Sequence, residues 1–226
     1  MRFSIVIPTW EQHGKGIFFL NQLLTSIKEQ TFTDFEVIIS DHSENDEIEN
    51  LSRTFPSLSI VYIRNFSNRG NSPANLNAGL SYAKGEIIKV MFQDDFFIDK
   101  HALSIIDKSF KATSHKWLVN GSCITTDSVT FTEHITPKWN DGLIEGVNTI
   151  GSPSVLSFVN ENILFFNEEL VMLMDCDYYY SLYRRYGAPC ILENCLVANT
   201  SHPYQISKMY DKDLKSEINL VKIKQL

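Results

Sequence analysis

Two adjacent carboxylates, Asp94 and Asp95, follow closely on Ile87–Phe92, a run of mainly β-branched and aromatic residues with the length of a strand. Neighbouring carboxylates repel each other unless a cation or another partner offsets their charge. Hard divalent cations take oxygen ligands, and magnesium often shares them with substrate phosphates. The pair therefore predicts a divalent-cation site. The alternative is a helix N-cap beside a solvated turn carboxylate.

A third carboxylate, Asp41, follows the strand-like run Phe35–Ile39 and leads into a polar segment. A carboxylate in that place can accept hydrogen bonds from the N–H of a pyrimidine ring or from ribose hydroxyls. An Asp that caps the following helix is the common alternative, and this residue alone does not decide between the two.

The elements that must position these carboxylates alternate between strand and helix patterns over the first hundred residues. This alternation predicts a mostly parallel sheet with helices on both faces. The predicted strands lie at Phe3–Ile7, Phe35–Ile39, Leu58–Ile63 and Ile87–Phe92. One helical face is indicated by the spacing of Leu20, Leu23, Leu24 and Ile27. Another helix begins at Ser72-Pro73, with Ser72 as N-cap, and ends at Lys84-Gly85.

Open α/β sheets bind ligands beyond the carboxyl ends of their strands. The residues expected at this edge are Pro8–Glu11, Asp41–Ser43 and Gln93–Asp95. Two acidic groups thus lie at the edge of the sheet where a ligand would bind.

The second half of the chain follows a different pattern. Asp99 is the expected N-cap of a helix that carries Leu103, Ile106 and Phe110. Short strands with turn residues follow between Trp117 and Phe166, with the clearest turn at Asn140–Gly142, and they predict a small mixed sheet or a layer of hairpins. A further helix is expected from Asp175 to Tyr186, ended by Gly187.

Composition excludes several classes of function. The 226 residues carry 20 Lys and Arg against 27 Asp and Glu, so nucleic acid is not an expected partner. The run Lys208–Lys224 is interleaved with Asp211, Asp213 and Glu217 and predicts a solvated helix face. The four cysteines show no paired spacing, which favours free thiols over a zinc site. No apolar run approaches the roughly 20 residues that span a bilayer, and the P-loop motif GxxxxGK[ST] is missing.

Several ordered blocks resemble family 2 glycosyltransferases with the GT-A fold. They are Phe3-Ser-Ile-Val-Ile-Pro-Thr, Phe35-Glu-Val-Ile-Ile-Ser-Asp, Asn68-Arg-Gly, Asn77-Ala-Gly, Lys84-Gly-Glu-Ile-Ile and Phe92-Gln-Asp-Asp. The resemblance covers the first hundred residues well. It implies one GT-A domain over residues 1–226, with a nucleotide-sugar-binding half at 1–98 and an acceptor-binding half at 99–226. It also implies nucleotide-binding roles for Pro8, Thr9, Glu11, Asp41, Arg69, Asn77 and Asp94.

The same resemblance places Asp94 and Asp95 at the DxD position, where Mn²⁺ or Mg²⁺ would bind the donor phosphates. Phe92 stands where the commoner DxDD form has its first Asp, so metal binding rests on Asp94 and Asp95, and we expect Asp95 to be the direct ligand. Ser201-His202-Pro resembles the late His element that helps to hold metal and diphosphate. For His202 the alternative is a structural histidine.

The C-terminal half matches the family more loosely. Gly151-Ser-Pro-Ser resembles the loop that lies against donor and acceptor, which implicates Gly151 and Ser152. Met174-Asp175-Cys-Asp177 resembles the block that supplies the general base. Asp175 lies four residues before Tyr179 on the apolar stripe of the expected helix, whereas Asp177 shares the opposite, polar face. Asp175 is therefore the predicted base, and Asp177 is expected to face solvent.

The resemblance implies a metal-dependent transfer of a sugar, with inversion, from a nucleotide-sugar to a hydroxyl of a glycan or lipid-linked acceptor. A UDP-sugar is the expected donor, because UDP donors are common in the family. The expected location is cytoplasmic, with or without peripheral attachment to a membrane, and the sequence does not indicate an oligomeric state. Two rival hypotheses are a nucleotidyltransferase and a non-catalytic nucleotide- or sugar-binding module. The first lacks the usual glycine- and basic-rich phosphate loop, for which His13-Gly-Lys-Gly is a weak candidate.

Overall fold

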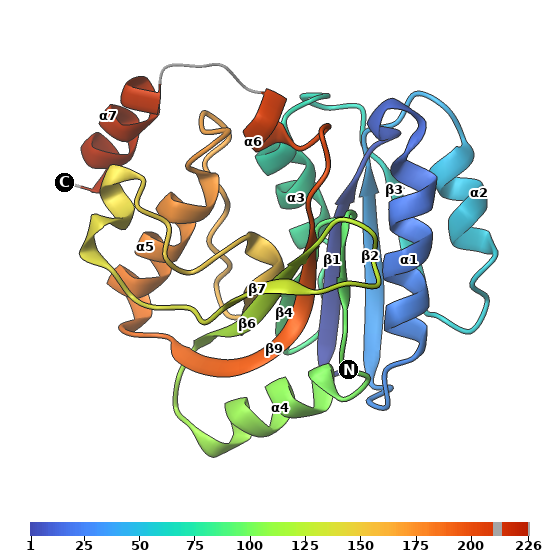
Figure 1. The fold of residues 1–226 in the computed structure, drawn as a ribbon, viewed down its shortest axis with the longest axis horizontal. Helices are drawn as coiled ribbons and strands as arrows, with labels where there is room; N and C mark the ends of the chain where they lie inside the picture. Colours follow the sequence, from blue (N-terminus) through green and yellow to red (C-terminus); the bar gives the residue numbers. More distant parts are fainter. Residues whose placement is uncertain (210–213, 226) are drawn as a thin grey trace.

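A computed structural model describes residues 1–209 and 214–225 and joins the strands of these ranges in one nine-stranded sheet (Figure 1). The order is β3-β2-β1-β4-β8-β6-β9-β5, with β7 paired to β6. Four parallel strands come from the first ninety residues: β1 (Phe3–Thr9), β2 (Phe35–Asp41), β3 (Ile60–Arg64) and β4 (Ile87–Val90). The predicted parallel half of the sheet is confirmed.

The strands of the second half extend the same sheet rather than forming a separate one. Antiparallel β8 lies between β4 and β6, and β9 runs parallel to β6 and antiparallel to β5. Their bounds are β5 (Asp95–Phe97), β6 (Trp117–Thr125), β7 (Thr132–Ile135), β8 (Leu156–Val159) and β9 (Cys190–Thr200). The mixed region predicted there is thus continuous with the parallel strands that end at the site.

Seven α-helices and three 3₁₀ turns are present in the described ranges. The helices are α1 (Gly16–Lys28), α2 (Glu47–Arg53), α3 (Ser72–Leu80), α4 (Ala102–Ala112), α5 (Met174–Tyr186), α6 (Ile206–Met209) and α7 (Leu214–Gln225). The 3₁₀ turns are η1 (Gln12–Gly14), η2 (Asp141–Glu145) and η3 (Pro153–Val155). Within these ranges, no helix combines the length and apolar character needed to cross a bilayer.

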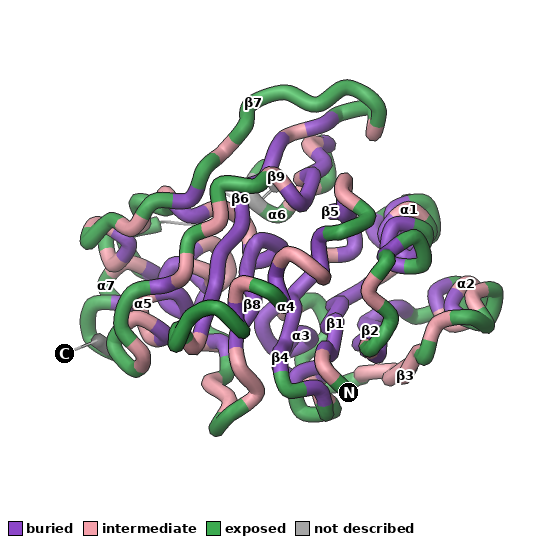
Figure 2. The backbone as a smooth tube through the Cα atoms, turned by 90° about the horizontal axis from the view of Figure 1, so that it is seen from below, coloured by how far each residue is buried: buried purple, intermediate pink, exposed green. Residues whose placement is uncertain are grey.

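Alternation along β1 creates the two layers of the core. Phe3, Ile5 and Ile7 pack against α1, α2 and α4, whereas Val6 belongs to the cluster under α3 and α5. The predicted apolar face of α1 is fully buried, and each such aliphatic side chain stabilises the fold by roughly 1.5–3 kcal/mol. Buried residues lie along the sheet, whereas β7 and the loop beside it are largely exposed (Figure 2).

Two predicted helix starts are shifted. The N-cap of α3 is Asn71, whose side chain accepts from the Ala74 N–H at 2.8 Å, so the prediction of Ser72 was one residue late. Asp99 is not the N-cap of α4, because that helix begins at Ala102; Asp99 instead accepts from the His101 N–H at 2.7 Å. Both side chains satisfy free backbone N–H groups, but local sequence does not say which of several polar residues does so.

The expectation that Asp177 faces solvent is wrong. Its side chain is 1% exposed, and its Oδ2 accepts from Lys224 Nζ at 2.7 Å, because α7 covers the polar side of α5. Glu217, expected on a solvated face, is likewise buried on α7. Residues 210–213, with Asp211 and Asp213, lie outside the described residues. Helical periodicity shows which residues share a face of one helix, but it does not show that a helix from about forty residues later covers that face.

Candidate functional site

A cavity of about 650 Å³ opens beyond the carboxyl ends of β1 and β4, a size within the usual range for ligand pockets. Eight predicted site residues line it: Pro8, Thr9, Glu11, Arg69, Asp94, Asp95, Ser152 and Asp175. The other four predicted residues, Asp41, Asn77, Gly151 and His202, lie outside this lining. The cavity therefore lies at the edge of the sheet where the sequence predicts ligand binding.

The loop after β1 forms one wall and is held by close backbone packing. A Cβ on Gly16 would lie 2.3 Å from the Trp10 carbonyl oxygen, so only glycine fits where the loop closes on itself. The Gln93 side chain ties this loop to the turn after β4, because it accepts from the Trp10 N–H at 2.7 Å and donates to the Trp10 carbonyl at 3.1 Å. Glu11 Oε2 is buried in this wall without a hydrogen-bond partner among the described residues.

Asp94 and His202 meet although 108 residues separate them. The Tyr204 N–H donates to His202 Nδ1 at 3.2 Å, and His202 Nε2 lies 2.9 Å from Asp94 Oδ2 and 3.3 Å from Gln12 Nε2. Phe19 stacks on the His202 ring with centroids 4.6 Å apart, which fixes the ring plane. His202 therefore contacts the acidic pair as predicted, although it does not itself line the cavity.

This pair also fits a shared cation. Two adjacent ligands of an octahedral ion at about 2.1 Å lie about 3 Å apart, which matches the separation of Asp94 Oδ2 and His202 Nε2. With an ion on Nε2, the ring would carry its proton on Nδ1, in place of the hydrogen bond from the Tyr204 N–H. No cluster of three or more His, Cys, Asp or Glu side chains within residues 1–209 and 214–225 forms a complete metal site. The donor set suits an ion that takes its remaining ligands from water and substrate phosphate.

Asp95 lies deeper than Asp94 and has protein partners on both oxygens. Its Oδ2 accepts from Asn199 Nδ2 at 2.8 Å and from Ser152 Oγ at 3.3 Å, and its Oδ1 accepts from the Thr200 N–H at 3.2 Å. Burial, together with the Asp94 carboxylate, raises the pKa of Asp95 to about 7. Asp95, which we expected to be the direct ligand, thus has a protein donor on each oxygen.

Asp175 also lines the cavity and lies in the first turn of α5. Its Oδ1 accepts from the Cys176 N–H at 2.7 Å, and its Oδ2 accepts from Asn148 Nδ2, also at 2.7 Å. Asn148 Nδ2 donates to the Gly151 carbonyl as well, at 3.1 Å, which brings the predicted Gly151 loop next to the carboxylate. Burial raises the pKa of Asp175 to about 6, a value suited to a general base near neutral pH.

Two predicted nucleotide-binding residues have structural partners instead of an open face. Asp41 is fully buried; its Oδ2 accepts from Tyr62 Oη at 2.7 Å and its Oδ1 from the Ser43 N–H at 2.9 Å. The Asn77 amide donates to the Phe166 carbonyl at 2.9 Å and accepts from its N–H at 2.8 Å. Both residues brace the segments around the cavity.

Arg69 brings positive charge to the lining on the side of β2 and α3. Its Nε donates to the His42 carbonyl at 3.0 Å, and its Nη1 pairs with Glu44 at 3.2 Å. Both contacts orient the guanidinium while its side chain stays 31% exposed. Such a group is suited to recognise phosphate.

Sequence reasoning assigned no role to three side-chain amides: Asn148 and Asn199 bond the carboxylates of Asp175 and Asp95, and Gln93 ties the loop after β1 to the turn of the acidic pair. Gln93 precedes the acidic pair, but nothing in the sequence assigns its partner. Asn148 accepts from the N–H groups of Ile150 and Gly151 at 2.9 and 3.0 Å, a local turn that residue type alone could have suggested. Its bond to Asp175 spans 27 residues and requires the fold.

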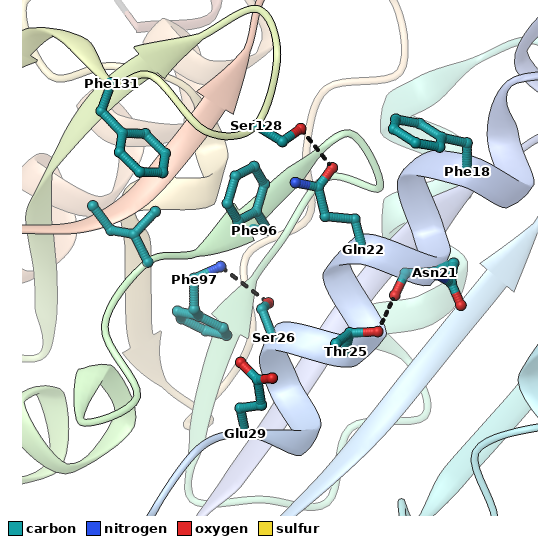
Figure 3. A pocket seen from close by; sticks show the side chains of 11 residues that line it. Phe18, Asn21, Gln22, Thr25, Ser26, Glu29, Phe96, Phe97, Ser128 and Phe131 are labelled. Carbon is teal, nitrogen blue, oxygen red and sulfur yellow. Dashed lines mark hydrogen bonds between the residues drawn. The ribbon is translucent and has the colours of Figure 1, made fainter.

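A second hollow, between α1, β5 and the β6–β7 loop, has a different chemistry (Figure 3). Phe18, Phe96 and Phe131 surround it, and Ser128 Oγ donates to Gln22 Oε1 at 3.1 Å. Its only carboxylate is Glu29, so it lacks the paired acids and the His of the larger cavity. The larger cavity is the candidate active site.

A family model and two known relatives match parts of this chain. The family model described as "Glycosyl transferase family 2" matches residues 4–121, just over half of the chain. GalNAc(5)-diNAcBac-PP-undecaprenol beta-1,3-glucosyltransferase of Campylobacter jejuni is 25% identical over 127 residues, 54% of this chain and 38% of that protein. Uncharacterized glycosyltransferase YwdF of Bacillus subtilis is 35% identical over 101 residues, 45% of this chain and 35% of that protein. The matches thus span little more than a third of these relatives' length.

Two solved structures show the same fold. Residues 1–349 of S. aureus TarS, in complex with UDP-GlcNAc, match with a TM-score of 0.75 at 18% identity, over 98% of this chain and 66% of that one. Mannosyltransferase PcManGT from Pyrobaculum calidifontis, in complex with GDP-Man and Mn²⁺, matches with a TM-score of 0.63 at 17% identity, over 86% and 56%. The predicted GT-A fold is confirmed.

Proposed function

Because the chain belongs to glycosyl transferase family 2, we propose that it transfers a sugar from a UDP-sugar to a hydroxyl of a glycan or glycolipid, with inversion at the anomeric carbon. The observation that carries this proposal is a single cavity lined by Asp94, which His202 contacts, and by Asp175. Asp94 with His202 suits a cation and a diphosphate, and Asp175 suits a hydroxyl that must lose its proton.

On the donor side, three features support a nucleotide diphosphate. Glu11 Oε2 is a buried acceptor that has no partner in the part of the chain that the structure describes, and a ribose hydroxyl would satisfy it. Arg69 supplies a positive charge toward phosphate. Asp94 and His202 would hold Mn²⁺ or Mg²⁺, and the ion would neutralise charge on the leaving diphosphate. The TarS neighbour with UDP-GlcNAc supports the choice of nucleotide, and the Mn²⁺ in the PcManGT neighbour supports the ion.

On the acceptor side, Val171, Met172 and Met174 give the lining beside Asp175 an apolar character. An apolar wall beside a base suits the hydrophobic face of a sugar or the carrier of a lipid-linked one. The Campylobacter jejuni relative is named for a lipid-linked acceptor, which supports the second form. A lipid-linked acceptor would bring the chain to a membrane surface.

We assign the donor to residues 1–98 and the acceptor to residues 99–226. The two halves share one sheet through the pairing of β4 with β8. They also share the site, because Asp94 of the first half contacts His202 of the second. The chain would therefore act as one unit.

In the proposed reaction, Asp175 accepts the proton of the acceptor hydroxyl as its oxygen forms a bond to the anomeric carbon. The bond from that carbon to the phosphate oxygen breaks, and the nucleoside diphosphate leaves with the electron pair. Asn148 and the Cys176 N–H keep the carboxylate oriented. General-base assistance of this kind contributes about 10²–10⁴-fold to the rate.

A donor and acceptor screen tests the proposal. UDP-GlcNAc, UDP-glucose and GDP-mannose are combined with octyl glycosides in the presence of Mn²⁺, and the released nucleotide is identified. We expect release of a nucleoside diphosphate with formation of a glycosylated acceptor. Nucleotide binding without turnover of any pair would contradict transfer and favour a binding module. Release of pyrophosphate from a nucleoside triphosphate would favour a nucleotidyltransferase.

A further inference from the structure

Glu217 on α7 is a buried carboxylate that serves the segment leading into α5. It is 4% exposed. Its Oε2 accepts from the N–H groups of Met172 and Leu173, both at 2.9 Å, and both of its oxygens accept from the Val171 N–H at 3.2 Å. Three successive backbone N–H groups thus converge on one anion, the arrangement of an anion-binding nest.

The contact lies just before the start of α5. Leu173 is the N-cap residue of that helix, and its apolar side chain accepts no hydrogen bond. Glu217 does not replace this cap, because it accepts from the N–H groups of residues 171–173 and the Cys176 N–H in the first turn is bonded by Asp175. Its charge is nevertheless in a favourable place, since the helix dipole favours an anion near a helix N-terminus.

The segment that Glu217 holds also borders the cavity. Val171, Met172 and Met174 line the cavity together with Asp175. Asp175 lies two residues after Leu173, whose N–H donates to Glu217. Farther along α7, Lys224 pairs with Asp177 at 2.7 Å, so the same helix contacts the first turn of α5 a second time. The position of α7 thus sets the position of that turn.

We propose that Glu217 is a positioning residue for transfer: its carboxylate fixes residues 171–173 and thereby the acceptor wall and the Asp175 carboxylate. This inference rests on the proposed function, because it assumes that Asp175 is the base. It makes the C-terminal helix part of the catalytic apparatus, although Glu217 does not line the cavity.

The test compares Glu217→Gln with Glu145→Gln. Glu145 pairs with Lys222 of the same helix at 3.1 Å but is 60% exposed, so it controls for weaker docking of α7. With the donor and octyl glycoside pair that the screen turns over, we expect Glu217→Gln to lower kcat by about 10- to 100-fold, as for a misplaced catalytic group. UDP affinity should change less than about twofold, because the donor side is untouched, and amide exchange at residues 171–173 should accelerate. Glu145→Gln should behave as the wild type.

The inference is overturned if Glu217→Gln accelerates amide exchange at residues 171–173 while kcat and the acceptor KM stay at wild-type values, since the carboxylate would then serve stability only. If Glu217→Gln does not fold, Glu217→Asp takes its place, because it keeps the charge but withdraws it by one methylene, and the same comparison applies. Asp175→Asn distinguishes a failure of this inference from a failure of the proposed function. If Asp175→Asn abolishes transfer and Glu217→Gln does not alter it, only this inference fails. If Asp175→Asn transfers normally, the base assignment fails, and this inference with it.

Discussion

The hydrogen bond from Asn148 to Asp175 provides a sharp test of the base, because its loss should move the pH dependence of the rate. Asn148→Asp keeps an oxygen that can accept from the N–H groups of Ile150 and Gly151, so the turn is retained. It removes the Nδ2–H donor 2.7 Å from Asp175 Oδ2 and places a like charge there. Both changes disfavour the ionised form of Asp175, so its pKa must rise.

The magnitude follows from the strength of that bond. A hydrogen bond to a charged group contributes about 1.5–3 kcal/mol, which corresponds to a rise in the Asp175 pKa from about 6 to about 7 or 8. A base must be ionised to act, so the rate increases with pH through this pKa. At pH 6 we expect kcat to fall about five- to fiftyfold, and above pH 9 to return close to the wild-type plateau.

The assay is kcat against pH at saturating donor and acceptor, with UDP affinity measured at each pH as a control for donor binding. An acid limb displaced upward with an unchanged plateau supports the reasoning. A lowered plateau with the limb still near the wild-type pKa would refute it, because Asn148 would then affect geometry or another step and not the ionisation of Asp175.

Three further outcomes are expected. Asp94→Asn should weaken Mn²⁺-dependent UDP binding by about 10- to 100-fold, because one charged ligand is lost. Calorimetry should show an unchanged affinity for uridine, and an equal loss of uridine affinity would contradict a role of Asp94 at the phosphates. Glu11→Gln should leave Tm nearly unchanged, since Oε2 has no partner in the described protein, yet weaken uridine binding by about tenfold; unchanged uridine affinity would remove Glu11 from the ribose site. Gly16→Ala should destabilise the fold by about 1–3 kcal/mol in urea unfolding, because its Cβ would lie 2.3 Å from the Trp10 carbonyl oxygen. An unchanged unfolding midpoint for Gly16→Ala would mean that the loop after β1 can shift to accommodate the Cβ without loss of stability.

Sequence patterns predicted the parallel half of the fold because each strand and helix there is short and strongly periodic. The apolar face of α1 is buried where its spacing placed it, and the acidic pair lies beyond β4 at the ligand-binding edge. Those features depend on alternation of side chains along single elements. They need no knowledge of distant partners.

Long-range contacts account for what sequence reasoning missed. Asp177 lies on the polar face of α5, but α7 supplies Lys224 and buries it. The choice between Asp94 and Asp95 depends on Asn199 and Thr200, which hold Asp95 from β9, a hundred residues away. A motif shows that two carboxylates are adjacent, but only tertiary packing decides which of them remains open.

The central claim is that the cavity beyond β1 and β4 holds a nucleotide diphosphate and a divalent cation at Asp94 and His202, with Asp175 as the base for the acceptor. A crystal soaked with UDP and Mn²⁺ tests it directly, since the anomalous signal of manganese locates the ion. We predict an anomalous peak in contact with Asp94 and His202 and a diphosphate bound to the same ion. A nucleotide bound outside this cavity, with no ion at Asp94, would contradict the account.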